Sequence, residues 1–269
     1  MGMWFGVLVI GAPGAGKSTF CAGLSDVFKQ LKRPFAVMNL DPANDSTSYD
    51  CDFDIKELIS VEEVMDRLGL GPNGALRYCM QTLAGNPGWL INKMNTNSDK
   101  YFIIDCPGQL ELYRSEGELD SLISQVEAAG GRLCAVHLMD CLYCSDPSSF
   151  ISVVISALSA MVALEMPHIN VLSKADLFDH NLPYDLEFYT QLPSVERLVD
   201  ILDNSPILSR YRGLNRAIAE VVDNKDLVNF LPLDVSSKED MARLLVHIDK
   251  ANGFALVEKN LREIVLQGT

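Results

Sequence analysis

Apolar residues along the chain form short continuous runs that alternate with longer stretches of helical periodicity. Six runs have the length and composition of buried parallel strands: residues 5–10, 35–40, 101–104, 132–139, 169–172 and 228–233. Five stretches between them have the pattern of helices: residues 18–31, 55–68, 74–94, 117–128 and 147–165. This alternation predicts an α/β fold, a doubly wound, mainly parallel sheet with helices on both faces.

A long interval separates the last two predicted strands. About fifty residues lie between Asp176 and the run that begins at Val228, many more than an αβ loop needs. Residues 193–204 and 207–224 have helical periodicity. We therefore expect a single domain over residues 1–269, with a helical insertion at about residues 178–226 before the last strand.

The composition narrows the class of protein. The chain has 36 acidic and 22 basic side chains, a formal net charge of −14. Nucleic acid and anionic membranes are bound through clustered Lys and Arg, so we expect no direct nucleic-acid binding and no membrane association. The most apolar stretch, residues 151–164, is broken by serines and too short to span a bilayer, which predicts a buried helix. The first five residues lack a basic stretch, and we expect no signal peptide.

Seven cysteines are scattered along the chain, and only Cys141 and Cys144 have CxxC spacing. No second pair completes a zinc cage, so we expect both to be small apolar packing residues. Such a set of cysteines suits a reducing compartment, the cytoplasm or the nucleus.

A glycine-rich segment that matches GxxxxGK[ST] lies between the first predicted strand and the first predicted helix. In such a loop the glycines let backbone N–H groups face phosphate oxygens. The lysine reaches the β- and γ-phosphates, and the serine hydroxyl can ligate Mg²⁺. The predicted phosphate-binding residues are Gly11, Ala12, Pro13, Gly14, Ala15, Gly16, Lys17, Ser18 and the adjoining Thr19.

The segment Ser173-Lys174-Ala175-Asp176 comes directly after a predicted core strand, at the sheet edge where such folds bind ligands. It resembles the N/TKxD element of GTPases. The Asp176 carboxylate can accept two hydrogen bonds from guanine N1 and N2, whereas adenine would leave it unpaired. The stem of Lys174 can cover the base. The backbone near Ser236, after the last strand, can contact guanine O6, although a serine there also suits a helix cap.

Polar residues that follow two other strands can supply the chemistry of phosphoryl transfer. Asp105 begins a segment that resembles the DxxG element of GTPases, in which the aspartate holds Mg²⁺ through water and Gly108 senses the γ-phosphate. Gln109 and Glu111 can orient the attacking water. Asp41 is a second carboxylate at this edge, either a base or an outer ligand of the metal, and a turn-forming Asp before proline is the alternative.

One further motif, Gly71-Pro72-Asn73, is by composition an ordinary turn between helices. Together with three other segments it makes the chain resemble the GPN-loop GTPases, from the first strand to about Gly253. The three segments are residues 41–44, 105–111 and 167–170. The stretches most similar to the second of the three eukaryotic paralogues are residues 40–44, 143–150 and 249–254.

This resemblance implies a dimeric P-loop NTPase of the SIMIBI type that hydrolyses GTP to GDP and phosphate with Mg²⁺. Gly71, Pro72 and Asn73 of one subunit would reach the nucleotide site of the other, where Asn73 contacts phosphate or the hydrolytic water. The dimer would be a homodimer or a heterodimer with another member. RNA polymerase subunits or their assembly factors would be the clients, and the protein would be cytoplasmic and shuttle to the nucleus.

Two features depart from the family pattern. The base element begins with Ser173 instead of Asn or Thr, and many members continue past the position of Thr269.

Three other classes of protein share parts of this pattern. ATPases with a deviant Walker motif act across a dimer through a lysine after the first glycine, where this chain has Ala12. A P-loop kinase needs only the phosphate loop, but residues 173–176 favour a GTPase. A nucleotide-gated assembly chaperone with little intrinsic hydrolysis remains compatible with the same site.

Overall fold

The computed structural model describes residues 3–45, 47–113, 117–192, 194–203, 208–223 and 228–258. Within these residues, seven strands form one sheet in the order β3-β2-β4-β1-β5-β6-β7, and every neighbouring pair is parallel. The strands are β1 (Trp4–Gly11), β2 (Phe35–Asn39), β3 (Phe53–Asp54), β4 (Tyr101–Asp105), β5 (Gly131–Asp140), β6 (His168–Ser173) and β7 (Phe230–Leu233). The predicted doubly wound parallel sheet is confirmed. Strand β3 was not predicted, because two residues make no apolar run.

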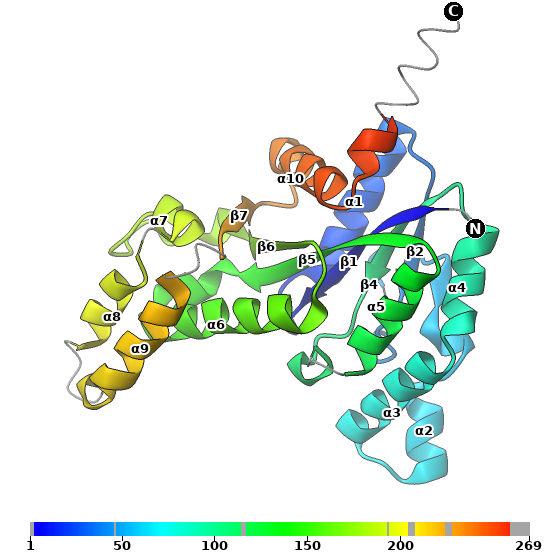
Figure 1. Ribbon diagram of the computed structural model, residues 1–269, viewed down its shortest axis with the longest axis horizontal. Helices are drawn as coiled ribbons and strands as arrows, with labels where there is room; N and C mark the ends of the chain where they lie inside the picture. Colours follow the sequence, from blue (N-terminus) through cyan, green and yellow to red (C-terminus); the bar gives the residue numbers. More distant parts are fainter. Residues whose placement is uncertain are drawn as a thin grey trace, which may run out of the picture.

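Helices cover both faces of the sheet (Figure 1). Helices α1 and α10 lie on one face, while α5 and α6 lie on the other. The helices are α1 (Lys17–Leu31), α2 (Val61–Leu68), α3 (Pro72–Gly85), α4 (Pro87–Thr96), α5 (Glu118–Ala128), α6 (Pro147–Leu164), α7 (Leu186–Gln191), α8 (Glu196–Asp203), α9 (Arg212–Asp223) and α10 (Lys238–Ala251).

Two predicted helices are each divided. The one predicted over residues 55–68 begins as a short 3₁₀ turn, η1 (Ile55–Glu57), and α2 starts only after Ser60, whose hydroxyl accepts from the Glu63 N–H at 3.2 Å. The one predicted over residues 74–94 stops at Gly85 and restarts as α4 at Pro87. Proline has no N–H to donate and its ring excludes the preceding turn, so α3 ends there.

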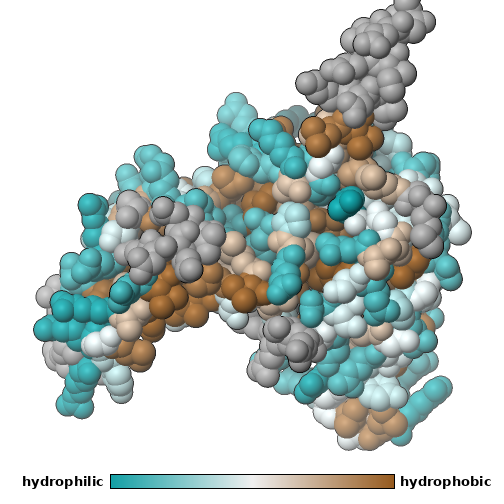
Figure 2. Space-filling model, in the orientation of Figure 1, coloured by the Kyte–Doolittle hydropathy of each residue, from teal (hydrophilic) through white to brown (hydrophobic). Residues whose placement is uncertain are grey.

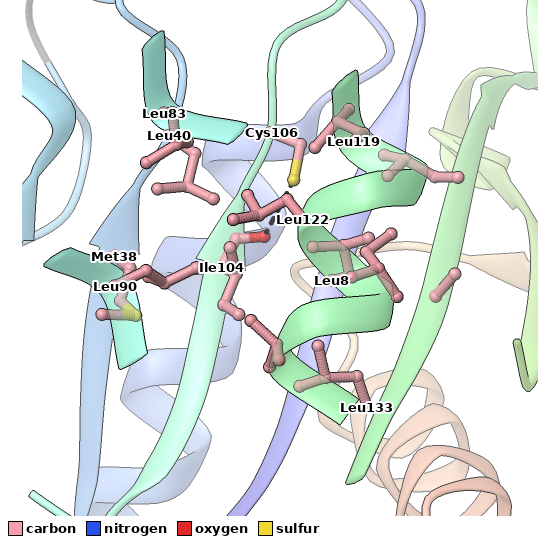
Figure 3. Close-up of a cluster of buried hydrophobic side chains, with 14 of the residues drawn as sticks. Leu8, Met38, Leu40, Leu83, Leu90, Ile104, Cys106, Leu119, Leu122 and Leu133 are labelled. Atoms are coloured by element: carbon pink, nitrogen blue, oxygen red, sulfur yellow. Dashed lines mark hydrogen bonds between the residues drawn. The ribbon is translucent and has the colours of Figure 1, made fainter. Parts of the chain in front are cut away.

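The core has two sides because side chains alternate along each strand. On β1, Leu8 and Ile10 belong to the cluster under α3, α4 and α5, whereas Val7 and Val9 face α1 and α10. Figure 3 shows the first cluster, where Leu8 of β1 and Ile104 of β4 lie among leucines of the covering helices. This packing holds the carboxyl ends of β1 and β4 in fixed register.

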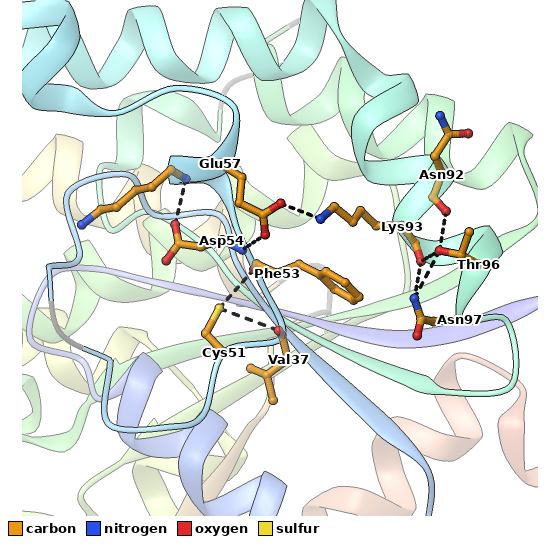
Figure 4. A network of polar contacts seen from close by, with 10 residues as sticks. Val37, Cys51, Phe53, Asp54, Glu57, Asn92, Lys93, Thr96 and Asn97 are labelled. Carbon is orange, nitrogen blue, oxygen red and sulfur yellow. Dashed lines mark hydrogen bonds and ion pairs between the residues drawn. The ribbon is translucent and has the colours of Figure 1, made fainter.

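The edge strand β3 is secured by a polar network (Figure 4). Asp54 caps η1 by accepting from the Lys56 N–H at 2.8 Å, and Glu57 reaches back to the Asp54 N–H. Lys93 of α4 pairs with Glu57 at 2.5 Å and lies 4.9 Å from the centre of the Phe53 ring. The network ties α4 to the segment that follows β2.

Helix α6 is buried on one face only, which corrects the sequence prediction of a buried helix. Among the described residues it is the one helix long and apolar enough to cross a membrane, with 18 residues and a mean hydropathy of 1.9. Its Phe150, Val154 and Ala157 lie in the core, but Ile155 and Val162 are exposed. An apolar strip runs over α6 on the face shown in Figure 2. The serines that interrupt the run are spaced for the outer face, so the helix packs along the sheet.

Helices α7, α8 and α9 lie between β6 and β7 in the chain and pack against α6, with Tyr189, Leu198 and Val222 in a shared cluster. The predicted insertion at about residues 178–226 covers them. Residues 193, 204–207 and 224–226 of that stretch lie outside the described residues.

Candidate functional site

The glycine-rich loop curls between β1 and α1 as its spacing predicts. Gly16, immediately before α1, has a φ of 92°. This left-handed backbone conformation is unfavourable for every residue except glycine. The Lys17 side chain is buried and folds over the loop, and its Nζ donates to the carbonyl oxygens of Gly11 at 3.0 Å and Ala12 at 3.2 Å. Phosphate oxygens can replace these two carbonyl oxygens as acceptors, because the Lys17 ammonium lies at the loop where a phosphate would bind.

Asp105 and Ser18 meet beside this loop. The Ser18 hydroxyl donates to Asp105 Oδ2 at 2.8 Å, and the Tyr49 hydroxyl donates to the same oxygen at 2.9 Å. Asp105 is 1% exposed, and its second oxygen, Oδ1, is buried without a hydrogen-bond partner. Burial raises the pKa of Asp105, while the two hydroxyl donors and the Lys17 ammonium oppose the shift.

This pair of residues fits the predicted magnesium site. No group of three His, Cys, Asp or Glu side chains that could hold a metal occurs in the described part of the chain. A Mg²⁺ ion commonly takes one or two protein oxygens, phosphate oxygens and water. The Ser18 hydroxyl and the unpartnered Asp105 oxygen match that donor set, with the carboxylate acting through water.

Asp41 lies at the same sheet edge but is occupied in a turn. Its Oδ1 accepts from the Ala43 N–H at 3.0 Å, and burial raises the pKa of its carboxyl. Asn44, in the same turn, donates to the Ser18 hydroxyl at 3.4 Å. The segment after β2 therefore reaches Ser18 through Asn44, and Asp41 shapes that segment.

Gly108 lies directly against the phosphate loop. A Cβ at this position would be 2.9 Å from Lys17 Nζ and 2.9 Å from the Pro13 nitrogen, so only glycine fits. Gln109 follows with its Oε1 buried and unpartnered, a polar atom available to a ligand. Glu111 is exposed and faces a groove along α6, lined also by Ser152, Ile155 and Ser156. Gln109 therefore follows directly on the residue that contacts the phosphate loop, whereas Glu111 faces the groove along α6.

The base element is attached to the phosphate loop. Ser173 is buried, and its hydroxyl contacts the Ala15 carbonyl at 2.8 Å and the Met139 carbonyl at 3.1 Å. Lys174 pairs with Asp140 at 2.6 Å. Asp176 is exposed in the turn η4 (Ala175–Leu177), with its carboxylate open to a ligand. Serine at the first position therefore fastens the two loops together.

The remaining predicted residues are placed apart from this cluster. The Ser236 N–H and hydroxyl both donate to Asp234 Oδ1, at 2.8 and 2.7 Å, within the exposed turn before α10. Thr19 is exposed on α1. Gly71 precedes α3, and Pro72 and Asn73 form its first turn at the exposed end of the α2–α3 pair (Figure 1). Among the described residues, no hydrogen bond joins these three to the phosphate loop.

A cavity of about 470 Å³ adjoins the outer side of the phosphate loop. It lies between Ala12–Ala15, the end of β5 and the serine-bearing face of α6, with Tyr143 and Lys174 at its rim. The phosphate loop is therefore open toward this cavity.

Tyr49 and Asp140 were not among the residues predicted from the sequence. Tyr49 belongs to no recognisable motif, and only the fold brings its hydroxyl to Asp105. Asp140 ends a core strand at the same edge as Asp105, so the argument that selected Asp105 applied equally to it.

Comparison with known proteins gives one consistent family. A family model described as "Conserved hypothetical ATP binding protein" matches residues 9–254. GPN-loop GTPase 2 of Danio rerio is 44% identical over 266 residues, which cover 97% of this chain and 86% of that protein. GPN-loop GTPase 3 of Kluyveromyces lactis is 40% identical over 253 residues, 93% of this chain and 92% of that protein.

A solved structure supports the fold. The apo form of a GTPase from Pyrococcus abyssi superposes with a TM-score of 0.72 at 23% identity, covering 92% of this chain and 97% of that one. With a family model over most of its length and relatives at least 40% identical over most of theirs, this chain belongs to the GPN-loop GTPases.

Proposed function

We propose that this protein binds GTP with Mg²⁺ and hydrolyses it to GDP and phosphate. The observation that carries the proposal is the connection between the two halves of the site. Ser173 joins the base element to Ala15 of the phosphate loop at 2.8 Å, and Ser18 joins that loop to Asp105 at 2.8 Å. One rigid unit thus presents a base-reading carboxylate, a phosphate cradle and the metal-binding oxygens.

The chain's own residues supply positioning and electrostatic stabilisation. Lys17 exchanges its loop carbonyls for β- and γ-phosphate oxygens, and the loop N–H groups hold the remaining charge. The backbone at Gly108 is close enough to Lys17 to contact the same γ-phosphate. Gln109 orients the attacking water, with Glu111 as a more distant alternative. Bound Mg²⁺ neutralises charge on the phosphates.

The proposed active form is a dimer in which Asn73 acts in trans. Three observations support this: Asn73 is exposed at the end of α2–α3, no described hydrogen bond links it to its own phosphate loop, and that loop is open on the cavity side. Ala12 excludes the lysine that dimeric ATPases use from this position. Exposed Leu68 and Leu70 flank the Gly-Pro-Asn turn and supply apolar contact area.

We also propose that hydrolysis times the assembly and nuclear import of RNA polymerase complexes, with polymerase subunits or assembly factors as clients. The net charge of −14 supports protein clients over nucleic acid. The partner subunit is a second copy or another GPN-loop GTPase, and the protein works in the cytoplasm and shuttles to the nucleus. Affinity capture of the full chain with GTP and with GDP, identified by mass spectrometry, tests both partner and client.

Replacing Asp176 by Asn tests base recognition. An amide donates where the carboxylate accepts, so the variant should lose GTP affinity by at least tenfold and gain xanthosine triphosphate affinity. Calorimetric titration of both nucleotides measures this. Asp179→Asn, an exposed acid three residues further on, is the matched control and should change neither affinity. Unchanged GTP binding by Asp176→Asn would refute the assignment.

Mixing a Lys17→Ala subunit with an Asn73→Ala subunit tests action in trans. In the mixed dimer one composite site has both defects and the other has neither. Each mixed dimer should therefore hydrolyse GTP at about half the wild-type rate. An equal mixture of the two inactive variants, in which about half of the dimers are mixed, should recover about a quarter of that rate, measured by phosphate release. A mixture as inactive as its components would show that Asn73 acts within its own subunit, and an Asn73→Ala variant as active as wild type would show that it has no catalytic role.

A further inference from the structure

Three contacts join the end of β5 to the base element. Strands β5 and β6 are neighbours in register, with Asp140 opposite Ser173. The Ser173 hydroxyl contacts the Met139 carbonyl at 3.1 Å, and Asp140 Oδ2 accepts from Lys174 Nζ at 2.6 Å. The Cys141 thiol donates to the Lys174 carbonyl at 2.8 Å. Met139, Asp140 and Cys141 therefore each hold one part of the loop that carries Asp176.

Lys174 has a backbone that needs such support. Its φ of 57° and ψ of 39° lie in the left-handed region, which a residue with a Cβ adopts only where its surroundings enforce it. Asp176 follows two residues later in η4, and the direction of its carboxylate depends on the path the chain takes at Lys174. The Cys141 thiol acts on the Lys174 carbonyl, directly at the strained residue.

Asp140 fixes the other end of Lys174. One carboxylate oxygen accepts from the Leu142 N–H at 3.0 Å, which caps the turn η3 (Cys141–Ser145), and the other accepts from the Lys174 ammonium. Because both oxygens are used, the carboxylate has a fixed orientation. The lysine stem is then held along the rim of the base site.

We propose that Asp140 and Cys141 are positioning residues for guanine specificity: they hold Lys174 in its left-handed conformation with its stem along the base, so that Asp176 faces the guanine edge. This inference rests on the proposed recognition of guanine by Asp176. In this role both residues act through Lys174. The proposal also assigns Cys141, the first cysteine of the CxxC pair, a role in addition to packing.

The state of the thiol is consistent with that role. Cys141 is 2% exposed, and burial raises its pKa to about 11, so the group stays protonated and able to donate at neutral pH. Serine can donate in the same place, whereas alanine cannot. Cys144, equally buried in the same turn, lies in the apolar cluster with Phe150 and makes no hydrogen bond to residues 173–176 among those described.

The test compares affinities for GDP and ADP, measured by calorimetry on the full-length chain. Cys141→Ala and Asp140→Asn should each weaken GDP binding about tenfold and leave ADP binding unchanged, so the GDP-to-ADP preference falls about tenfold. Cys141→Ser should restore most of it. Cys144→Ala is the matched control: it removes a neighbouring buried thiol and should lower Tm without changing the preference.

Two outcomes separate this inference from the proposed function. If wild type prefers GDP and Asp176→Asn prefers xanthosine diphosphate, but Cys141→Ala and Asp140→Asn keep the wild-type preference, the positioning role is wrong and guanine recognition stands. If wild type shows no guanine preference, the proposed function fails and the inference fails with it. The Asp140 side chain is 20% exposed and asparagine has nearly the same size, so Asp140→Asn keeps the test decisive should Cys141→Ala not fold.

Discussion

Asp105 shows how a buried carboxylate is kept ready for a ligand. Two hydroxyls, from Ser18 and Tyr49, donate to one of its oxygens and leave the other unpaired. An unpaired buried oxygen is unfavourable by about 1–3 kcal/mol, which a metal-bound water would relieve. The Tyr49 contact also joins the segment after β2 to β4, so this segment and the metal site are expected to respond to each other.

Tyr49→Phe should separate these two effects. Losing one buried hydrogen bond to a carboxylate should lower the free energy of unfolding by about 1–2 kcal/mol, measured by urea denaturation. Asp105 Oδ2 then keeps only the Ser18 hydroxyl as a donor and the carboxylate is less firmly oriented, so the Mg²⁺ concentration for half-maximal GTP binding should rise several-fold. Tyr78→Phe, an exposed tyrosine on α3, is the control and should change neither quantity.

At the scale of elements, α1 and α10 are joined at the end of the sheet remote from the site. Arg33, just past α1, makes a two-pronged ion pair with Asp249 of α10, at 2.9 and 2.8 Å. Both side chains are about nine-tenths buried, and the guanidinium lies 4.4 Å from the centre of the Phe254 ring and 5.0 Å from that of Phe28. This cluster fixes the angle between the two helices that cover one face.

Arg33→Leu should therefore destabilise the fold without disturbing the site. Leaving Asp249 charged and unpaired in a buried place should lower the free energy of unfolding by about 3 kcal/mol. Adding Asp249→Leu should recover a large part of that loss, because the double variant has no buried charge. Chemical denaturation measures both. GTP affinity of the folded protein should stay within twofold of wild type, and a larger drop would contradict the separation of this cluster from the site.

Six strands and most helices could be predicted because long apolar runs and helical periodicity are local signals. Local signals were insufficient where a single residue divides a helix, as at Pro87, or where a short edge strand depends on a neighbour, as at β3. The phosphate loop and base element were recognisable because their chemistry demands fixed spacing. Tyr49 was not, since its role depends on a partner 56 positions away, whereas Asp140 has the same position at a strand end as Asp105 and could have been selected on it.

At the scale of the whole molecule, two imidazoles are enclosed between the sheet and α6. His137 of β5 and His168 of β6 have ring centres 5.5 Å apart, and burial lowers their pKa values to about 3 and about 4. The unfolded chain binds these protons near pH 6.5, so below that pH it holds more protons than the folded chain. The stability that depends on these two neutral histidines is therefore fully present above pH 6.5, and the free energy of unfolding decreases as the pH drops toward 4.

His137→Gln should make the protein less sensitive to acid. Each histidine contributes a loss of about 1.4 kcal/mol per pH unit below 6.5, or about 2 kcal/mol between pH 7.5 and 5. The difference in unfolding free energy between these two pH values should therefore be about 2 kcal/mol smaller in the variant than in wild type. His247→Gln, on α10, provides the comparison. Equal pH dependence of wild type and His137→Gln would mean that His137 does not stay neutral in the fold.

Strand β1 lies in the middle of the sheet, yet it is the first strand to leave the ribosome. Its partners are β4 and β5, so the pairing of Trp4–Gly11 is incomplete until residue 140 has been made. Until residue 105 has been made, this apolar strand has neither neighbour, and until residue 140 it has only one. Unpaired apolar strands expose nascent chains to aggregation and recruit chaperones. The nucleotide pocket also cannot form before β5 is in place. A protein proposed to assist the assembly of others is therefore itself expected to bind chaperones while it is being synthesised.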